Sequence, residues 1–105
     1  RVLAHIEAHL HDSKAVSLPA LARQACLSEF HFARMFRQSM GCTVHEWVLQ
    51  QRLARARRAL SARNVPPLAE LALDCGFSSA SHLVRSFRAH LGVTPTQFSI
   101  FQRNA

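Results

Sequence analysis

The residues best suited to bind another molecule are arginines that recur at one spacing in two stretches of the sequence. Residues 31–43 are HFARMFRQSMGCT, and residues 82–94 are HLVRSFRAHLGVT. The histidine, both arginines, one phenylalanine, the glycine and the threonine occupy identical places in the two stretches. A guanidinium group can donate two parallel hydrogen bonds to a guanine edge or neutralise a phosphate. The repeat therefore indicates one cationic surface that is presented twice.

A helical wheel separates these arginines from an apolar stripe in both stretches. Phe32 and Phe36 share the apolar face of the first helix. Leu83, Phe87 and Leu91 share that of the second. The opposite faces carry Phe30, Ala33, Arg34 and Arg37 in the first helix and Ser81, Val84, Arg85 and Arg88 in the second. One arginine stripe is typical of a solvated helix face, but two stripes in the same register favour a binding surface.

The net charge indicates an anionic partner. Lys and Arg number 13 against 6 Asp and Glu, which gives a formal net charge of +7, and no acidic residue follows Asp74. A compact basic domain of this kind is typical of proteins that bind nucleic acid. No apolar run approaches the roughly 20 residues of a membrane span, and no signal peptide is recognisable. We therefore expect a cytoplasmic protein without membrane contact.

The spacing of apolar residues is helical throughout the chain, and strand-like alternation is nowhere sustained. Leu3, Ile6 and Leu10 form the apolar stripe expected for a first helix. The glycine of each repeated stretch is expected to end its helix, and the NVPP segment, 64–67, must interrupt another. The predicted helices are 1–11, 18–25, 29–40, 44–62, 68–75, 79–91 and a last short helix that begins near Pro95.

The repeat extends backward from the cationic helices. LPALARQACLS, residues 18–28, aligns with LAELALDCGFS, residues 68–78, at an offset of 50, whereas the helices that follow align at 51. Each copy is a short helix, a tight turn and a second helix, which is the helix-turn-helix arrangement. We predict one all-α, seven-helix domain over 1–105. It consists of a first helix-turn-helix subdomain (about 1–43), a long central linker helix (about 44–62) and a second helix-turn-helix subdomain (about 66–105).

The linker helix has a length that suits duplex DNA. Roughly 19 residues at 1.5 Å each span about 28 Å, and two recognition helices on one face of B-DNA lie about 34 Å apart. We therefore expect recognition helices at about 29–40 and 79–91 to enter successive major grooves. The exposed side of the linker is expected to carry Arg52, Arg55 and Arg58, which would contact phosphates or pair with Glu46.

At this point the residues resemble a known family. RLARARRALSARNVPPLAELALDCGFSSASHLVRSFRAHLGVTP, residues 52–95, is similar to the signature of AraC/XylS-type transcription regulators, and LARQACLSEFHFARMFRQSMG, residues 21–41, fits their first helix-turn-helix. The resemblance covers essentially the whole chain. It implies a seven-helix domain that binds double-stranded DNA to regulate transcription, commonly as an activator that contacts RNA polymerase. It also implies a separate N-terminal sensor or dimerisation domain, and the start at Arg1 agrees with a missing N-terminal part.

Carried over position by position, the resemblance implies which side chains contact DNA. The candidates for base contact are Glu29, Phe30, Ala33 and Arg34 in the first recognition helix and Ser79, Ala80, Ser81, His82 and Arg85 in the second. The candidates for phosphate contact are Ser28, Arg37, Arg52, Arg55, Arg58 and Arg88. Arg34 and Arg85 are expected to make the strongest base contacts, about 1–3 kcal/mol each against a wrong base. Ser28 and Ser79 also suit helix N-caps.

Four positions depart from the family pattern. Cys26 stands in the first turn where glycine is frequent, and a non-glycine residue there would need a strained backbone. Leu83 replaces a usual aromatic residue but fills core space as well. Phe98 and Ser99 replace the family's final tyrosine–arginine pair, which removes one possible phosphate contact.

Other functions are supported by fewer residues. His5 and His9, with His11 nearby, could bind a metal ion side by side, but no cysteine or acidic pair joins them at a recognised spacing. An enzyme would need a nucleophile with a base, or paired carboxylates, and the acidic residues are scattered. A basic module that binds an acidic protein is the alternative, and it would show no DNA sequence preference. We therefore expect no metal, no cofactor and no catalysis.

The odd number of cysteines argues against a disulfide framework. Cys26, Cys42 and Cys75 form no CxxC pair. We expect them to be small apolar residues near the core rather than redox sensors.

Overall fold

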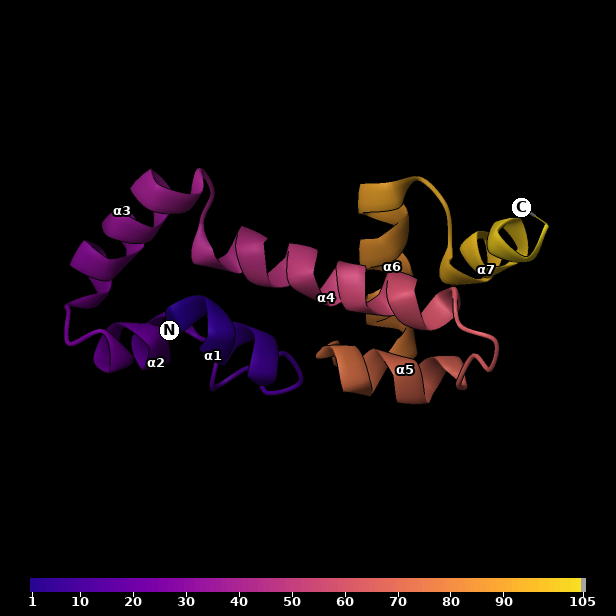
Figure 1. Cartoon of the computed structure of the whole chain (residues 1–105), viewed down its shortest axis with the longest axis horizontal. Coiled ribbons are helices and arrows are strands. Elements are labelled where there is room, and N and C mark those ends of the chain that lie inside the picture. Colours follow the sequence, from indigo (N-terminus) through magenta and orange to yellow (C-terminus); the bar gives the residue numbers. More distant parts are fainter. Residues whose placement is uncertain (105) are drawn as a thin grey trace. The chain divides into compact units, whose positions relative to one another are not determined.

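The computed structural model describes residues 1–104, which form seven helices and no strand (Figure 1). The helices are α1 (Val2–Ala8), α2 (Leu18–Gln24), α3 (Glu29–Met40), α4 (Val44–Leu60), α5 (Leu68–Cys75), α6 (Ala80–Leu91) and α7 (Pro95–Arg103). The predicted all-α class and the predicted order of seven helices are confirmed. None of these helices is both long enough and apolar enough to cross a membrane.

The chain divides into two compact units, Arg1–Gln51 and Arg52–Ala105. Each unit contains one helix-turn-helix pair: α2 packs on α3 in the first, and α5 packs on α6 in the second. α4 is one continuous helix of 17 residues whose first part belongs to the first unit and whose second part belongs to the second. Each unit therefore combines a helix pair with one part of α4.

The first unit buries one side of each of its helices. Its core consists of Ile6, Leu10, Val16, Leu21, Ala22, Phe32, Phe36, Val44 and Val48. α1 ends at Ala8, earlier than predicted, because the His9 N–H donates to the Ile6 carbonyl three residues back and tightens the last turn. Leu10 stays buried in the turn that follows. The predicted stripe is wrong for Leu3, which is 42% exposed.

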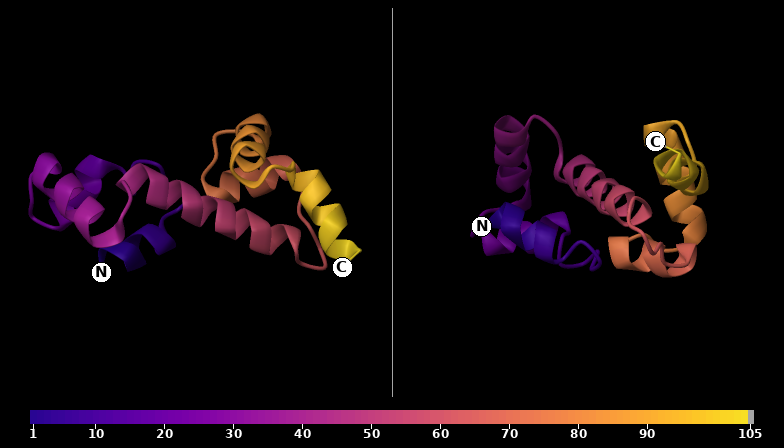
Figure 2. Two further views of the ribbon diagram at one scale, coloured as in Figure 1. Left: turned by 90° about the horizontal axis from the view of Figure 1, so that it is seen from above. Right: turned by 45° about the vertical axis from the view of Figure 1, so that its right-hand side comes forward.

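The second unit packs α6 against both α5 and α7. Figures 1 and 2 show that the axis of α6 crosses the axis of α5 at a steep angle. Leu83 and Phe87 form the fully buried face of α6, and Phe87 meets Phe98 of α7 edge to face with 5.5 Å between ring centroids. The buried Ser99 hydroxyl donates to the Leu60 carbonyl at 3.5 Å, which ties α7 to the end of α4. Phe98 and Ser99, which stand where the resembled family has a tyrosine–arginine pair, are thus part of the packing of this unit.

Local hydrogen bonds determine where α4 begins and ends. Thr43 and Glu46 form a capping box: the Thr43 N–H donates to the Glu46 carboxylate at 2.9 Å, and the Glu46 N–H donates to Thr43 Oγ1 at 3.1 Å. The hydrogen bond from the Thr43 N–H to the carboxylate is the largest of the causes that lower the pKa of Glu46. At the other end, the Ser61 hydroxyl donates to the Arg57 carbonyl at 2.9 Å, and the helix ends at Leu60 rather than at residue 62. The Glu46 carboxylate is therefore engaged at the start of α4.

The turns inside the two helix pairs share one backbone conformation. In both, an N–H donates to the carbonyl five residues back, as in a Schellman motif. The two bonds are Leu27 to Ala22, 3.0 Å, and Phe77 to Ala72, 2.8 Å. The residue before each donor is left-handed, with φ of +58° at Cys26 and +97° at Gly76. Since this conformation is unfavourable for a residue with a Cβ atom, the strained backbone expected at Cys26 is confirmed.

The Cys26→Gly substitution is expected to raise the free energy of unfolding by about 0.5–1 kcal/mol. Glycine avoids the left-handed penalty of roughly 1–2 kcal/mol, part of which is offset by its greater freedom in the unfolded chain. The reciprocal Gly76→Ala change should lower the free energy of unfolding by about 1 kcal/mol. Chemical denaturation measures both. Cys26→Ala is the control, because it removes the thiol and keeps the backbone penalty; equal stability of the Cys26→Gly and Cys26→Ala proteins would contradict the argument.

Candidate nucleic-acid interface

Two N-caps start the helices that carry the repeated arginines. Ser28 Oγ accepts a hydrogen bond from the His31 N–H, and Ser79 Oγ accepts one from the His82 N–H, each at 3.1 Å. The capping roles predicted for both serines are confirmed. α3 and α6 each contain 12 residues and end at a glycine in the left-handed conformation. The two helices therefore begin and end in the same register, so Arg34 and Arg37 of α3 occupy the places that Arg85 and Arg88 occupy in α6.

The buried stripe of α3 determines which residues this helix presents. Phe32 and Phe36 are buried in the core of the first unit. Among the predicted DNA-contacting residues, Ala33 is half-buried. The exposed ones are Ser28, Glu29, Phe30, Arg34 and Arg37. Phe30 is 75% exposed, so its ring is available for apolar contact, for example with a thymine methyl group.

The outer face of α6 is small and polar apart from its arginines. Ala80 is half-buried. The exposed candidates are Ser79, Ser81, Arg85 and Arg88. The first turn of α6 contains no acidic residue, and within residues 1–104 no salt bridge engages Arg85 or Arg88. The free N–H groups at the start of the helix and these two guanidinium groups therefore form one positive surface.

His82 is held by the turn that precedes α6. Its Nδ1 accepts a hydrogen bond from the Ser78 N–H at 3.2 Å and lies 3.1 Å from the Ser78 hydroxyl. Its ring also meets Phe77 edge to face at 5.3 Å between centroids. Because a backbone N–H can only donate, Nδ1 is the acceptor, and the hydrogen of the neutral ring lies on Nε2. This arrangement leaves His82 half-buried with one polar edge directed by the turn.

Sequence reasoning missed this role of His82, although a signal was present. The offset between the two copies changes from 50 to 51 inside the turn, and the extra residue of the second copy is Ser78. His31, the equivalent of His82, is exposed and accepts no such hydrogen bond in the described part of the chain. One inserted residue therefore supplies the partner that distinguishes the two histidines.

The arginines of α4 are less accessible than expected. Arg58 is exposed, but Arg52 and Arg55 are half-buried. Burial lowers the pKa of the Arg52 guanidinium group. Arg55 Nη1 donates to the Asp74 carbonyl at 3.4 Å. The expectation that all three lie on an exposed side of the helix is wrong for Arg52 and Arg55, because the end of α5 offers Arg55 one of its terminal carbonyls as a partner.

The histidines near the N-terminus bond to the backbone. His5 Nε2 lies 3.0 Å from the Ala15 carbonyl, and His9 Nδ1 lies 2.8 Å from the His5 carbonyl, with the two rings stacked at 4.2 Å between centroids. Within residues 1–104, no three His, Cys, Asp or Glu side chains gather closely enough to hold a metal ion. The His5 imidazole thus connects α1 to the segment that follows it, and the His9 imidazole bonds back to α1.

The three cysteines lie in different environments. Cys75 is buried, and burial raises the pKa of its thiol to about 11. Cys42 is half-buried. Cys26 is exposed, so the expectation that all three lie near the core is wrong at this position. Cys26 lies in the turn between α2 and α3, whereas Cys75 lies in the buried part of α5.

Comparison with known proteins identifies a family to which the chain is similar. Residues 21–99 match a family described as "Helix-turn-helix domain". The chain is 37% identical over 99 residues to the probable transcriptional regulator LumQ of Photobacterium leiognathi, which covers 94% of this chain and 39% of that protein. The chain thus spans about two fifths of the length of this relative.

Solved structures share the fold of the whole chain. The DNA-binding domain of AdpA, a global transcriptional factor solved in complex with a target DNA, matches with a TM-score of 0.89 and 32% identity, covering 98% of this chain and 90% of that one. A transcriptional regulator from Chromobacterium violaceum, described as an AraC-type DNA-binding domain-containing protein, matches with a TM-score of 0.85 and 27% identity, covering 96% of this chain and 88% of that one.

The two equivalent histidines provide a matched pair of substitutions. His82→Ala should lower the free energy of unfolding by about 1 kcal/mol, because it removes the acceptor of the Ser78 N–H and the ring contact with Phe77. His31→Ala should change it by less than about 0.5 kcal/mol, as is usual for an exposed residue. Denaturant unfolding of both variants measures the difference, and nitrogen-15 NMR of the histidine side chains reports the tautomer. A predominantly Nδ1-protonated neutral His82 would contradict the hydrogen bond from Ser78.

Proposed function

The chain belongs to the AraC/XylS-type family of helix-turn-helix transcription regulators, and we propose that it binds duplex DNA sequence-specifically through α3 and α6. One observation carries the proposal: both helices start from a serine cap, bury one apolar stripe and expose an arginine at the same register position, Arg34 and Arg85. A single exposed arginine is a weak indication of nucleic-acid binding. Two that are presented by the same local architecture favour a common ligand with a repeating surface, which B-DNA provides.

We propose different contacts for the two helices. Arg34 and Arg85 donate to guanine edges, each discriminating by about 1–3 kcal/mol. In α3, Phe30 and Ala33 offer apolar surface to thymine methyl groups beside Glu29. In α6, the small residues Ser79, Ala80 and Ser81 allow close approach, and His82 donates from Nε2 because its Nδ1 is engaged by Ser78.

Phosphate contacts are assigned to exposed cations and to helix starts. These are Ser28, Arg37, Arg58 and Arg88, all exposed. Arg52 and Arg55, which were also expected to bind phosphate, are half-buried and have partners within the chain, so we assign them a structural role instead.

We further propose that α3 and α6 enter successive major grooves. α4 contains 17 residues, which corresponds to about 25 Å at 1.5 Å per residue. The turns at its two ends add to that length, and one turn of B-DNA is about 34 Å. The length of an uninterrupted helix supports this spacing.

The complete regulator is expected to contain more than this domain. Because the chain spans 39% of LumQ, we propose that an N-terminal sensor or dimerisation domain accompanies it in a cytoplasmic protein. We also propose that the regulator acts as an activator through contact with RNA polymerase, and that it performs no catalysis. These proposals are supported by the match of the chain to a family of transcription regulators.

Selection of binding sites from a random duplex library tests the main proposal. We expect two short conserved blocks about one helical turn apart, because both recognition helices contact bases. A single block would contradict base contact by both helices, and the absence of any enrichment would contradict sequence-specific binding by this chain. Sequencing of the enriched pool distinguishes the three results.

Substitution of the two α6 arginines separates base contact from phosphate contact. Arg85→Ala should weaken binding to the selected site by about 1–3 kcal/mol and relax the preference at one base pair, with a smaller effect on random DNA. Arg88→Ala should weaken both about equally and reduce the salt dependence of binding by about one unit of slope. Affinities are measured by fluorescence anisotropy over a range of salt concentrations. Equal losses on selected and random DNA for Arg85→Ala would show that Arg85 contacts only phosphate.

A further inference from the structure

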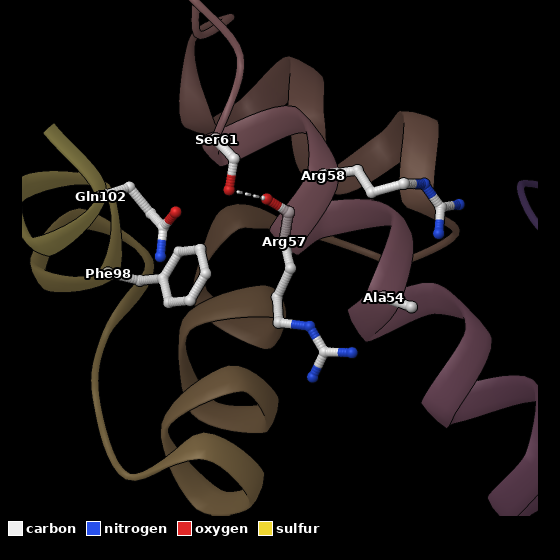
Figure 3. Close-up of a pocket in the computed structure, with 6 residues that line it drawn as sticks. All are labelled: Ala54, Arg57, Arg58, Ser61, Phe98 and Gln102. Atoms are coloured by element: carbon white, nitrogen blue, oxygen red, sulfur yellow. Dashed lines mark hydrogen bonds between the residues drawn. The ribbon is translucent and has the colours of Figure 1, made fainter. Parts of the chain in front are cut away.

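The second unit contains a groove in which only one lining residue, Arg58, is also a proposed DNA contact. It lies between the second part of α4 and α7 and has a volume of about 420 Å³ (Figure 3). The residues that line it are Ala54, Arg57, Arg58, Ser61, Phe98 and Gln102. Figure 3 shows Phe98 and Gln102 of α7 on one side of the groove and Arg57 of α4 reaching along the other. The cationic side chain of Arg57 thus faces the aromatic ring of Phe98 and the amide group of Gln102.

The charge of this groove is uncompensated within the described residues. Arg57 and Arg58 are exposed, and neither guanidinium group takes part in a salt bridge in residues 1–104. The Ser61 hydroxyl is already used, because it donates to the Arg57 carbonyl at 2.9 Å. No acidic residue occurs in the sequence after Asp74, so α7 brings no negative charge to the groove. Figure 3 shows the two guanidinium groups directed to different sides of α4, so each is matched to a separate carboxylate, which it can bind in a bidentate manner.

The opposite wall of the groove offers apolar contact. Phe98 is half-buried, and Phe101, three residues later on the same helix, is 58% exposed. Residues three apart on a helix are neighbours on its surface, so Phe101 extends the aromatic surface beyond Phe98. Gln102 adds an amide that can both donate and accept hydrogen bonds. The groove therefore combines cationic and aromatic contacts, whereas a phosphate backbone alone would require only the cationic part.

The position of Phe98 places the groove on the buried side of α6. Phe98 contacts Phe87 edge to face, and Phe87 is fully buried. Arg85 precedes Phe87 by two residues and therefore points to the opposite side of the helix, about 200° away. The surface proposed to contact bases and the aromatic wall of the groove thus lie on opposite sides of α6. This separation argues against duplex DNA as the occupant of the groove.

We propose that the groove binds an acidic, amphipathic segment of a partner protein. Carboxylates of that segment pair with Arg57 and Arg58, and an apolar side chain between them rests on Phe98 and Phe101. Recognition of acidic motifs by clustered arginines is an established mode of peptide binding. The proposal does not depend on which bases α3 and α6 contact.

A synthetic peptide that alternates pairs of glutamate and leucine serves as the probe. Titration into the isotopically labelled chain at low salt should shift the backbone NMR signals of 54–61 and 98–102. Two control peptides carry glutamine in place of each glutamate, or serine in place of each leucine, and both should bind about tenfold more weakly. Shifts confined to α3 and α6, or equal binding of the three peptides, would overturn the proposal.

Substitutions in the chain complete the test. The change Arg57→Glu should weaken the peptide about tenfold, and Phe101→Ser should weaken it severalfold without disturbing the core. Arg63→Glu is the matched control, because Arg63 is exposed and lies outside the groove, and it should change binding less than about twofold. Thermal unfolding establishes that each variant is folded. Equal effects of Arg63→Glu and Arg57→Glu would overturn the proposal, as would a greater loss of duplex DNA binding than of peptide binding in the Arg57→Glu variant.

Discussion

Burial of one apolar stripe determines what α3 and α6 present to a partner. Phe36 and Phe87 lie in the cores of their units, and the arginines two positions earlier are exposed. Burying a phenylalanine side chain contributes roughly 1.5–3 kcal/mol, whereas burying an unpaired guanidinium group costs several kcal/mol. Rotating either helix by half a turn would lose the first contribution and add the second cost. Both effects favour one rotation, so the candidate interface is a consequence of the core.

Periodicity predicted the helices and their outward faces because both depend on residues close in sequence. Four of the seven predicted ranges agree with the structure to within a residue at each end, and the serine caps follow from local hydrogen bonding. The incorrect expectations concern contacts between distant residues. The half-burial of Arg55 depends on the Asp74 carbonyl, 19 positions away. Leu3 fits the apolar pattern of α1, but the residues of this helix that pack on the core are Val2 and Ile6, and Leu3 is 42% exposed.

The two copies of the motif stabilise the same turn in different ways. The first accepts Cys26 in the left-handed region, at a cost of roughly 1–2 kcal/mol relative to an ordinary backbone. The second has Gly76 at this place and one additional residue, Ser78, which donates to His82. The helices also differ near their starts: α3 presents the exposed ring of Phe30, whereas α6 presents small polar groups and the His82 imidazole that Ser78 orients. A repeated fold therefore gives two chemically different surfaces, as contact with two different base sequences would require.

The second unit separates two possible contact surfaces by an apolar layer. Arg85 and Arg88 lie on the outer side of α6, and the Phe87–Phe98 contact lies on its inner side, next to the groove that contains Arg57 and Arg58. The two surfaces share one side chain, Arg58, which is also a candidate for phosphate contact. A ligand on one of them can therefore compete with a ligand on the other only through Arg58. Simultaneous occupancy would be limited by the stability of the aromatic contact that joins α6 to α7, because loss of that contact would change both the rotation of α6 and the wall of the groove.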